Sequence, residues 1–326
     1  MTQPTSVNMT FDTSLVDLNP NSSFSTTESD PSDIGASTTK TPTMKQSTPP
    51  QTIQSNLTPL PTESSAPVQI IKTQEAYDQW ASVYDSDGNM LQAIDDIELS
   101  SSHLLSDFFD RVQMKAAAGT VLLLDLGCGT GRNTAKLLDL AMQVDRSHTL
   151  LGLDFSAHML SAAAKKLQPC NVGPKRIRLR LESCNCFPTA DNPSEDPVPF
   201  VVRCIPEPIH GVISTLVLEH VPLKAFFATL SALLQHGGFA LVTNMHPDMG
   251  ASSQAGFVNK DGVKIRGSSF VHTVEDTVKE ARSAGFHVLE TREREMKMED
   301  VESGAVGERG RKWIGTKVWF GLVLVK

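Results

Sequence analysis

Long apolar runs and paired cysteines are both missing from this chain of 326 residues. No run approaches the roughly 18 apolar residues that a membrane-spanning helix requires, so we expect no membrane span. The five cysteines include no C-x-x-C pair, and the C-x-C of Cys184 and Cys186 has no second pair to complete a zinc site. The sequence therefore argues against a disulfide scaffold and a zinc ribbon. It favours ordinary thiols in a reducing compartment and predicts a cytoplasmic protein.

Arginine is absent from the start of the chain, where the first one is Arg111. Among the first 70 residues, 35 are Ser, Thr or Pro. Such a segment cannot bury enough apolar surface to offset its loss of conformational entropy. Residues 1–67 are therefore predicted to be a disordered tail, and residues 68–326 to be the folded domain. The tail has neither the apolar core of a secretory signal nor the arginines of a transit peptide.

Positive charge is also scarce, and this excludes one class of partner. The formal net charge is -8, and the first 70 residues carry -4 of it from two lysines and six acids. The rest of the chain carries the other -4. Neither part has the basic surface that nucleic-acid binding requires, so no nucleic-acid partner is expected.

The stretch from Val121 to Gly131 reads V-L-L-L-D-L-G-C-G-T-G and is the most informative part of the sequence. Its apolar start is typical of a strand buried on both faces of a parallel sheet. Gly127, Gly129 and Gly131 then allow the backbone to turn sharply and a ligand to come close. Because a helical pattern follows at Thr130–Met142, the stretch predicts a strand, a glycine turn and a helix N-terminus, which together form a nucleotide-type site.

Two residues decide which ligand suits this turn. Arg132 stands where a dinucleotide motif, G-x-G-x-x-G/A, needs a small residue, and no G-K-[S/T] of a Walker loop follows. Asp125 places a carboxylate beside the turn, which suits an ammonium or sulfonium better than a pyrophosphate. The pattern D-x-G-x-G-x-G resembles the first motif of the class I S-adenosylmethionine-dependent methyltransferases, [D/E]-x-G-x-G-x-G.

A second motif extends this resemblance. A strand is predicted at Thr149–Leu153, and Asp154 follows it, 23 residues after Gly131. The stretch D-F-S-A-H-M-L, from Asp154 to Leu160, is similar to the family's D-x-S-x-x-M-L, whose acid binds the ribose hydroxyls. Ser183 stands where the family usually has an aspartate for the adenine amino group, which is a departure from the pattern. The resemblance implies S-adenosyl-L-methionine as the cofactor, bound by Tyr84, Asp125, Gly127, Cys128, Gly129, Gly131, Asp154, Phe155, Ser183 and Leu216.

An aromatic helix is predicted before the glycine motif, at Thr73–Tyr84. Its pattern Y-D-x-x-A-x-x-Y-D resembles the lid helix of small-molecule methyltransferases. The resemblance implies that Tyr84 closes over the methionine end of the cofactor. For Tyr77, core packing and a functional role both stay open.

Five later segments complete the expected sheet. The alternating charges of the first of them predict a strand near the sheet edge, where charge blocks pairing with other chains. With the intervening helical patterns, they predict an α/β fold with a doubly wound, Rossmann-like sheet of about seven strands, mostly parallel with an antiparallel last strand. The segments are Arg176–Glu182, Val212–Leu218, Phe239–Thr243, Phe286–Glu290 and Lys317–Val325.

Three histidines are the candidate catalytic residues. His220 and His246 follow two predicted strands, and His272 ends a segment, residues 250–269, that has few strand or helix signals and is typical of a substrate loop. Each imidazole is a candidate general base, with a structural role as the alternative. No acid cluster has the spacing of a metal site, so no metal is expected.

The stretch L-E-H-V, Leu218–Val221, resembles quinone-biosynthesis and related small-molecule methyltransferases. The expected function is methyl transfer from S-adenosyl-L-methionine to an O, N or C nucleophile of a small molecule, with specialised metabolism as one setting. Two alternatives remain: a methyltransferase-like binding protein without turnover, and a protein or RNA methyltransferase. The sequence leaves the methyl acceptor and the oligomeric state open.

Overall fold

The computed structural model of the chain describes residues 67–116, 119–167, 177–187 and 208–326. The predicted tail lies outside these residues except for Pro67, and so does Arg176 at the start of one predicted strand. The first strand, β1 (Val68–Ile70), begins at the residue where the composition changes.

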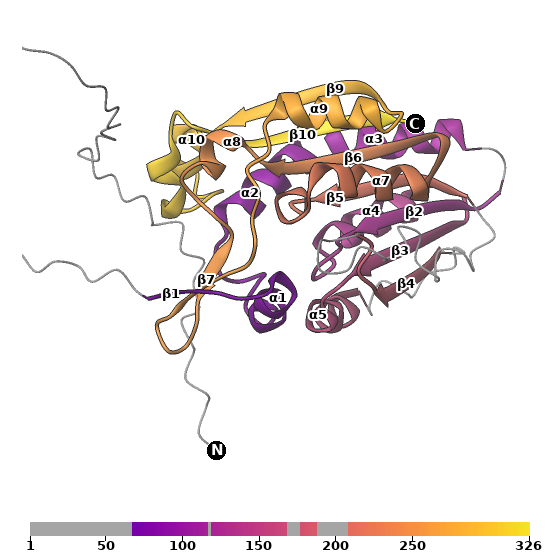
Figure 1. Ribbon diagram of the computed structural model, residues 1–326. Helices are drawn as coiled ribbons and strands as arrows, with labels where there is room; N and C mark the ends of the chain where they lie inside the picture. The colour runs from indigo at the N-terminus through magenta and orange to yellow at the C-terminus, as the bar shows by residue number, and fades with distance from the viewer. Residues whose placement is uncertain (1–66, 117–118, 168–176, 188–207) are drawn as a thin grey trace, which may run out of the picture. The chain divides into compact units, whose positions relative to one another are not determined.

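A seven-stranded sheet forms the centre of the fold, in the strand order β4-β3-β2-β5-β6-β10-β9 (Figure 1). Only β10 runs antiparallel to its neighbours, β6 and β9. The other neighbouring pairs are parallel. The prediction of a doubly wound, mostly parallel sheet with an antiparallel last strand is therefore confirmed. The strands are β2 (Val121–Leu126), β3 (His148–Asp154), β4 (Ile177–Ser183), β5 (Ile209–Thr215), β6 (Leu234–Met245), β9 (His287–Glu295) and β10 (Lys317–Val325).

Alternation along the strands divides the core into two layers, one on each face of the sheet. In β2 every residue is buried, and Leu123 packs into one hydrophobic cluster while Leu122 and Leu124 pack into the other. Successive side chains of a strand point to opposite faces, so an unbroken apolar run is what a strand covered on both faces requires. Strand β4 is an edge strand with alternating burial, as its charges predicted.

Helices cover both faces of this sheet. Phe108 and Leu137 belong to the first cluster, whereas Phe226 and Ala281 belong to the second, so α3 and α4 lie on one face and α7 and α9 on the other. The helices are α1 (Thr73–Trp80), α2 (Met90–Asp96), α3 (Leu104–Lys115), α4 (Arg132–Gln143), α5 (Ala157–Leu167), α7 (Leu223–Leu233), α8 (Pro247–Gly250), α9 (Val274–Ser283) and α10 (Met298–Glu302).

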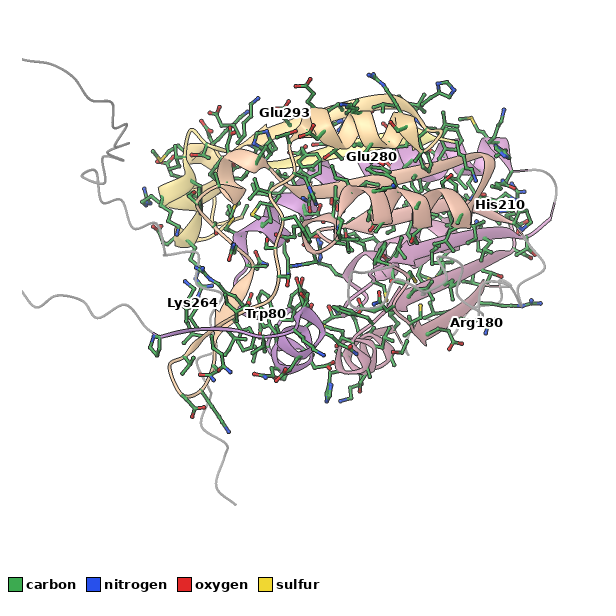
Figure 2. All side chains as sticks on the ribbon, in the orientation of Figure 1. Trp80, Arg180, His210, Lys264, Glu280 and Glu293 are labelled. Carbon is green, nitrogen blue, oxygen red and sulfur yellow. The ribbon has the colours of Figure 1, made fainter. Side chains whose placement is uncertain are left out.

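A second, three-stranded sheet forms where the sequence predicted an irregular segment. Strands β7 (Gly256–Val258) and β8 (Lys264–Arg266) form an antiparallel hairpin, and β1 pairs in parallel with β8. Trp80 of α1 stacks on Phe257, with 5.5 Å between ring centroids, and Figure 2 shows Trp80 beside this sheet. Each of these strands has only three residues, which is too short for apolar periodicity to predict a strand. The prediction of an irregular segment was therefore wrong for these residues.

The central strand β5 ends earlier than the predicted Leu218. It stops at Thr215, because Leu216 takes a left-handed backbone conformation with φ 57°. A short 3₁₀ turn, Leu218–His220, follows. The side chains of the L-E-H-V stretch therefore lie on a turn beyond the carboxyl end of the sheet rather than on the strand.

Candidate functional site

The glycine turn after β2 has the backbone that only glycine adopts easily. Gly127, Gly129 and Gly131 have φ angles of 80°, 53° and 76°. A Cβ atom on Gly127 would lie 2.3 Å from Val217 Cγ2, and one on Gly131 would lie 2.9 Å from Leu167 Cδ1. A Cβ on Gly129 would meet no atom within 4 Å. The first and third glycines are thus required by the protein's own packing, whereas Gly129 faces open space.

Asp125 supplies a buried acceptor beside this turn. Its side chain is 2% exposed, and Thr134 Oγ1 donates to its Oδ2 at 2.6 Å. Its Oδ1 has no hydrogen-bond partner among the described residues. Burial raises the pKa of Asp125 to about 7, although the Thr134 hydroxyl opposes this shift. A ligand that offers a cationic donor would satisfy Oδ1 and favour the charged carboxylate.

Asp154, at the end of β3, shapes the same turn. Its Oδ2 accepts from the backbone N–H of Gly129 at 2.8 Å, and its Oδ1 accepts from that of Ser156 at 2.8 Å. Burial raises the pKa of Asp154, although these backbone donors oppose the shift. Each oxygen keeps a second lone pair that is able to accept a ligand hydroxyl. Ser183 lies next to Asp154 in the register of β4 and is exposed.

The neighbouring residues Cys128 and Phe155 complete this wall. The N–H of Cys128 donates to Leu153 O at 3.0 Å, which ties the turn to the end of β3. Phe155 is half-buried, and its ring lies 6.3 Å from that of Tyr77.

Helix α1 lies against this turn and is tied to it by side chains. Ser156 Oγ donates to Asp78 Oδ1 at 2.5 Å, and Gln74 Nε2 donates to Phe155 O at 2.8 Å. Just beyond the helix, Asp85 accepts from Thr130 Oγ1 at 2.6 Å. Figure 1 shows α1 beside α5, the helix that follows Asp154. The aromatic helix is thus held over the candidate cofactor site, where a lid belongs.

A cavity opens between α1 and the carboxyl ends of β5 and β6. It encloses about 360 Å³, including its open mouth. The rings of Tyr77, Trp80 and Tyr84 form one wall, with centroids 4.9–5.9 Å apart. Its lining residues are Tyr77, Trp80, Tyr84, Asn89, Leu91, Leu216, Glu219, Met245, Met249, Ser253, Gln254 and Ala255.

Leu216 lines this cavity and has a strained backbone, with φ 57°. A left-handed conformation costs a residue with a Cβ about 1–2 kcal/mol. Leu216 keeps it because its N–H donates to Thr243 O at 2.9 Å and its side chain is buried. Strain of this kind is concentrated at functional sites, and here it directs the chain from β5 into the cavity wall.

The three candidate histidines have different surroundings. His220 Nε2 lies 2.7 Å from the hydroxyl of Tyr77, and its Nδ1 lies 2.9 Å from Ser268 O. Since a carbonyl only accepts, Nδ1 carries the proton, and the Tyr77 hydroxyl donates to Nε2. His220 therefore reaches the cavity wall through Tyr77.

His246 and His272 are held by other groups. His246 caps α8, where its Nδ1 accepts from the N–H of Asp248 at 3.1 Å, and its Nε2 lies 3.3 Å from Glu293, which Figure 2 labels on β9. His272 Nε2 donates to Val221 O at 2.9 Å, and burial lowers the pKa of this histidine. Neither lines the cavity described above.

Comparison with known proteins identifies the family. A methyltransferase-domain family model matches residues 124–240. An uncharacterized methyltransferase of Emericella nidulans is 39% identical over 274 residues, which cover 78% of this chain and 91% of that protein. The chain belongs to the methyltransferase family. The class I resemblance of its glycine motif is thereby confirmed, and the expected cofactor, S-adenosyl-L-methionine, stands with it.

Two further proteins are similar to this chain, one over a shorter stretch and the other at lower sequence identity. A demethylmenaquinone methyltransferase of Lactobacillus johnsonii is 38% identical over 84 residues, 26% of this methyltransferase and 32% of that one. The magnesium protoporphyrin IX methyltransferase of Synechocystis PCC 6803, solved with bound SAH, is 16% identical and has a TM-score of 0.44. The similarity covers 77% of this chain and 94% of the Synechocystis protein.

The residues of this methyltransferase fit its cofactor. Asp125 has an unpaired buried oxygen for an ammonium, Gly129 leaves the turn open, and Asp154 has free lone pairs. Within the described ranges, no group of three or more His, Cys, Asp or Glu side chains is arranged to hold a metal ion. In those same ranges, no helix has the length and apolar character to cross a membrane.

Sequence reasoning missed several residues of the cavity. Glu219 was visible in the L-E-H-V stretch, but its burial, at 3% exposed, was not. Trp80, Met245 and Met249 gave no signal beyond ordinary core residues. Only the fold brings them to Tyr84, because they come from α1, β6 and α8.

Proposed function

We propose that this methyltransferase transfers the methyl group of S-adenosyl-L-methionine to an O, N or C nucleophile of a small molecule. The observation that carries the proposal is the cavity between α1 and the ends of β5 and β6, beside the glycine turn. Its lining combines aromatic and other apolar side chains with a few polar groups, among them Glu219 and Asn89, as is typical of small-molecule sites. The formal charge of -8 also disfavours a nucleic-acid substrate.

Several residues have proposed roles in holding the cofactor. Asp125 Oδ1 would accept from its ammonium, Asp154 would accept from its ribose hydroxyls, and Gly129 would let it approach the backbone. Ser183, beside Asp154, would face its adenine side, and Tyr84 would cover its methionine end. Cys128, Phe155 and Leu216 complete the proposed wall. When bound, the cofactor supplies a methyl group already activated by a positively charged sulfur.

The protein's own contribution is alignment, exclusion of water and handling of a proton. The aromatic wall of α1 holds the acceptor in the cavity, and such positioning accounts for most of the acceleration that this chemistry needs. His220 is the proposed base, since its unprotonated Nε2 faces the Tyr77 hydroxyl at 2.7 Å. Burial raises the pKa of Tyr77 well above its usual value, so Tyr77 serves as a donor rather than as a base.

His246 and His272 stay weaker proposals for the base. His246 is engaged with Asp248 and Glu293, and His272 with Val221 O. None of these partners lines the cavity, whereas the partner of His220 Nε2, Tyr77, does. Replacing each of the three with Gln separates these roles. Loss of a base lowers turnover, whereas loss of a structural histidine lowers the melting temperature.

One experiment tests the proposed function. The full chain is incubated with methyl-labelled S-adenosyl-L-methionine and a fractionated cell extract, and Asp154→Asn serves as the control. We expect label in the small-molecule fraction with the unchanged chain and much less with the variant. The identity of the product would also test a role in specialised metabolism. Label in protein or RNA alone would contradict a small-molecule acceptor, and no label in any fraction would contradict turnover.

A further inference from the structure

The carboxyl of Glu219 is buried in the cavity wall without its full set of hydrogen bonds. Its backbone is fixed, since its N–H donates to Asn244 Oδ1 at 3.0 Å and its carbonyl accepts from Phe270 N at 2.7 Å. Its Oε2, however, has no partner among the described residues. The His220 ring is 3.8 Å from Oε1, which is too long for a hydrogen bond. A buried carboxyl left in this state costs free energy that a ligand donor recovers.

Aromatic rings surround this carboxyl. Tyr77, Trp80 and Tyr84 line the same cavity, and so does Met245 of β6. Burial comes first in raising the pKa of Tyr77 and of Tyr84, and the charge of Glu219 adds to both shifts. Aromatic faces attract cations, at about 0.5–2 kcal/mol for each well-placed ring. A neutral hydroxyl would satisfy the carboxyl alone, whereas an ammonium group satisfies the carboxyl and gains from the rings.

The cofactor does not account for this carboxyl. Its sulfonium has no hydrogen to donate, so it cannot pair with Glu219 Oε2. Its ammonium already has a proposed partner in Asp125 Oδ1, which lies at the glycine turn and is itself unpaired. The donor that Glu219 lacks must therefore come from the second substrate.

We propose that Glu219 binds the nitrogen of the methyl acceptor, and that the acceptor is a small aliphatic amine. This inference rests on the proposed function and specifies its substrate class. Glu219 holds the ammonium, which gives a proton to the Tyr77 hydroxyl as Tyr77 passes its own to His220 Nε2, the proposed base, and this frees the nitrogen lone pair. The lone pair then forms the N–C bond as the C–S bond breaks, and that bond's electrons return to sulfur. The methylated nitrogen carries the positive charge away, and His220 returns its proton to water.

A matched pair of probes tests the proposal. N,N-dimethylethanolamine is cationic at neutral pH, and 3-methylbutan-1-ol has the same shape with C–H in place of N–H. Binding to the full chain, saturated with S-adenosylhomocysteine, is measured by the NMR signal of the Trp80 indole N–H. We expect the amine to bind at least about tenfold more tightly than the alcohol. In Glu219→Gln the preference should fall below about threefold, because the isosteric amide removes the charge.

Two controls make the result decisive. Glu275→Gln removes one exposed carboxylate from α9 and should keep the full preference. Calorimetry with S-adenosylhomocysteine tests the proposed function separately. If the chain does not bind S-adenosylhomocysteine, both proposals are removed. If the cofactor product binds normally, the inference is overturned by absence of amine binding, by equal binding of the two probes, or by a preference that survives in Glu219→Gln.

Discussion

Affinity for the cofactor should depend on pH through Asp125, and the asparagine variant should remove that dependence. Burial raises the pKa of this carboxyl to about 7 in the free protein. Its Oδ1 is the buried acceptor proposed for the cofactor's ammonium, and only the ionised carboxylate attracts a cation strongly. At low pH, binding must therefore first remove a proton from Asp125.

The size of the effect follows from the pKa. At pH 7 about half of the Asp125 side chains are ionised, whereas at pH 5 about one in a hundred is. Affinity for S-adenosylhomocysteine should thus fall by about 50-fold between pH 7 and pH 5, or roughly 2.3 kcal/mol. Asp125→Asn keeps an acceptor for Thr134 and has no proton to lose. Its affinity should be lower at pH 7 and should change little between pH 7 and pH 5.

Calorimetry in two buffers of different ionisation enthalpy measures both quantities. At pH 6 the unchanged chain should release close to one more proton on binding than Asp125→Asn does. Other groups titrate in this range, including Asp87, whose pKa burial raises to about 6, and they contribute to both chains alike. The reasoning fails if the two chains release equal numbers of protons, or if their affinities change in parallel with pH.

Three further predictions address folding and the site. Asp154→Asn, which removes one carboxylate acceptor, should weaken S-adenosylhomocysteine binding by at least about tenfold while the chain stays folded, as calorimetry and thermal unfolding would show. Gly129→Ala should weaken that binding with a loss of only about 1 kcal/mol of stability, because nothing lies within 4 Å of the added Cβ. Gly131→Ala should lose more stability, because its Cβ would lie 2.9 Å from Leu167; equal melting temperatures would contradict this. His220→Gln should lower turnover by about 10²–10⁴-fold with cofactor affinity unchanged. His246→Gln should mainly lower the melting temperature, and the reverse order would refute these assignments.

The asparagine variant at Asp125 also bears on stability. A carboxyl has an ordinary pKa of about 3.9 in the unfolded chain, and burial raises it to about 7 in the folded one. The folded state therefore holds the proton more tightly, so this group's contribution is fully present below about pH 4 and is lost as pH rises through about 7. Urea unfolding at pH 8 should show Asp125→Asn as the more stable chain, and a less stable variant would contradict this reading.

The main sheet was predictable because its information is local. Each central strand is a short apolar run, and the acids and glycines that end β2 and β3 follow directly in the sequence. The end of β5 was not predictable, since Val217 and Leu218 are as apolar as the strand before them. What ends the strand is the left-handed backbone of Leu216, which is held by the bond from its N–H to Thr243 O of β6.

The cofactor motifs were recognisable by their resemblance to those of the methyltransferase family, but the cavity was not. Tyr77 and His220 are 143 residues apart, and the sequence offered core packing as an equal reading of Tyr77. Trp80 meets Phe257 across an even longer separation. Glycines and acids are informative because few other residues replace them, whereas an aromatic residue or a methionine looks the same in any core. The substrate side of the site therefore needed the fold.

Asp125 and Glu219 are both buried carboxyls with an unpaired oxygen; Asp125 lies on β2, and Glu219 lies on the turn that follows the neighbouring strand β5. Burial raises the pKa of both, so a bound cation would stabilise the ionised form that burial disfavours. The two sites face opposite demands. The cofactor keeps its charge, and Asp125 must stay ionised to hold it. An amine acceptor must lose its charge, because an ammonium has no lone pair and is repelled by the nearby sulfonium. Glu219 meets that demand by holding the ammonium beside Tyr77, through which the proton passes to His220.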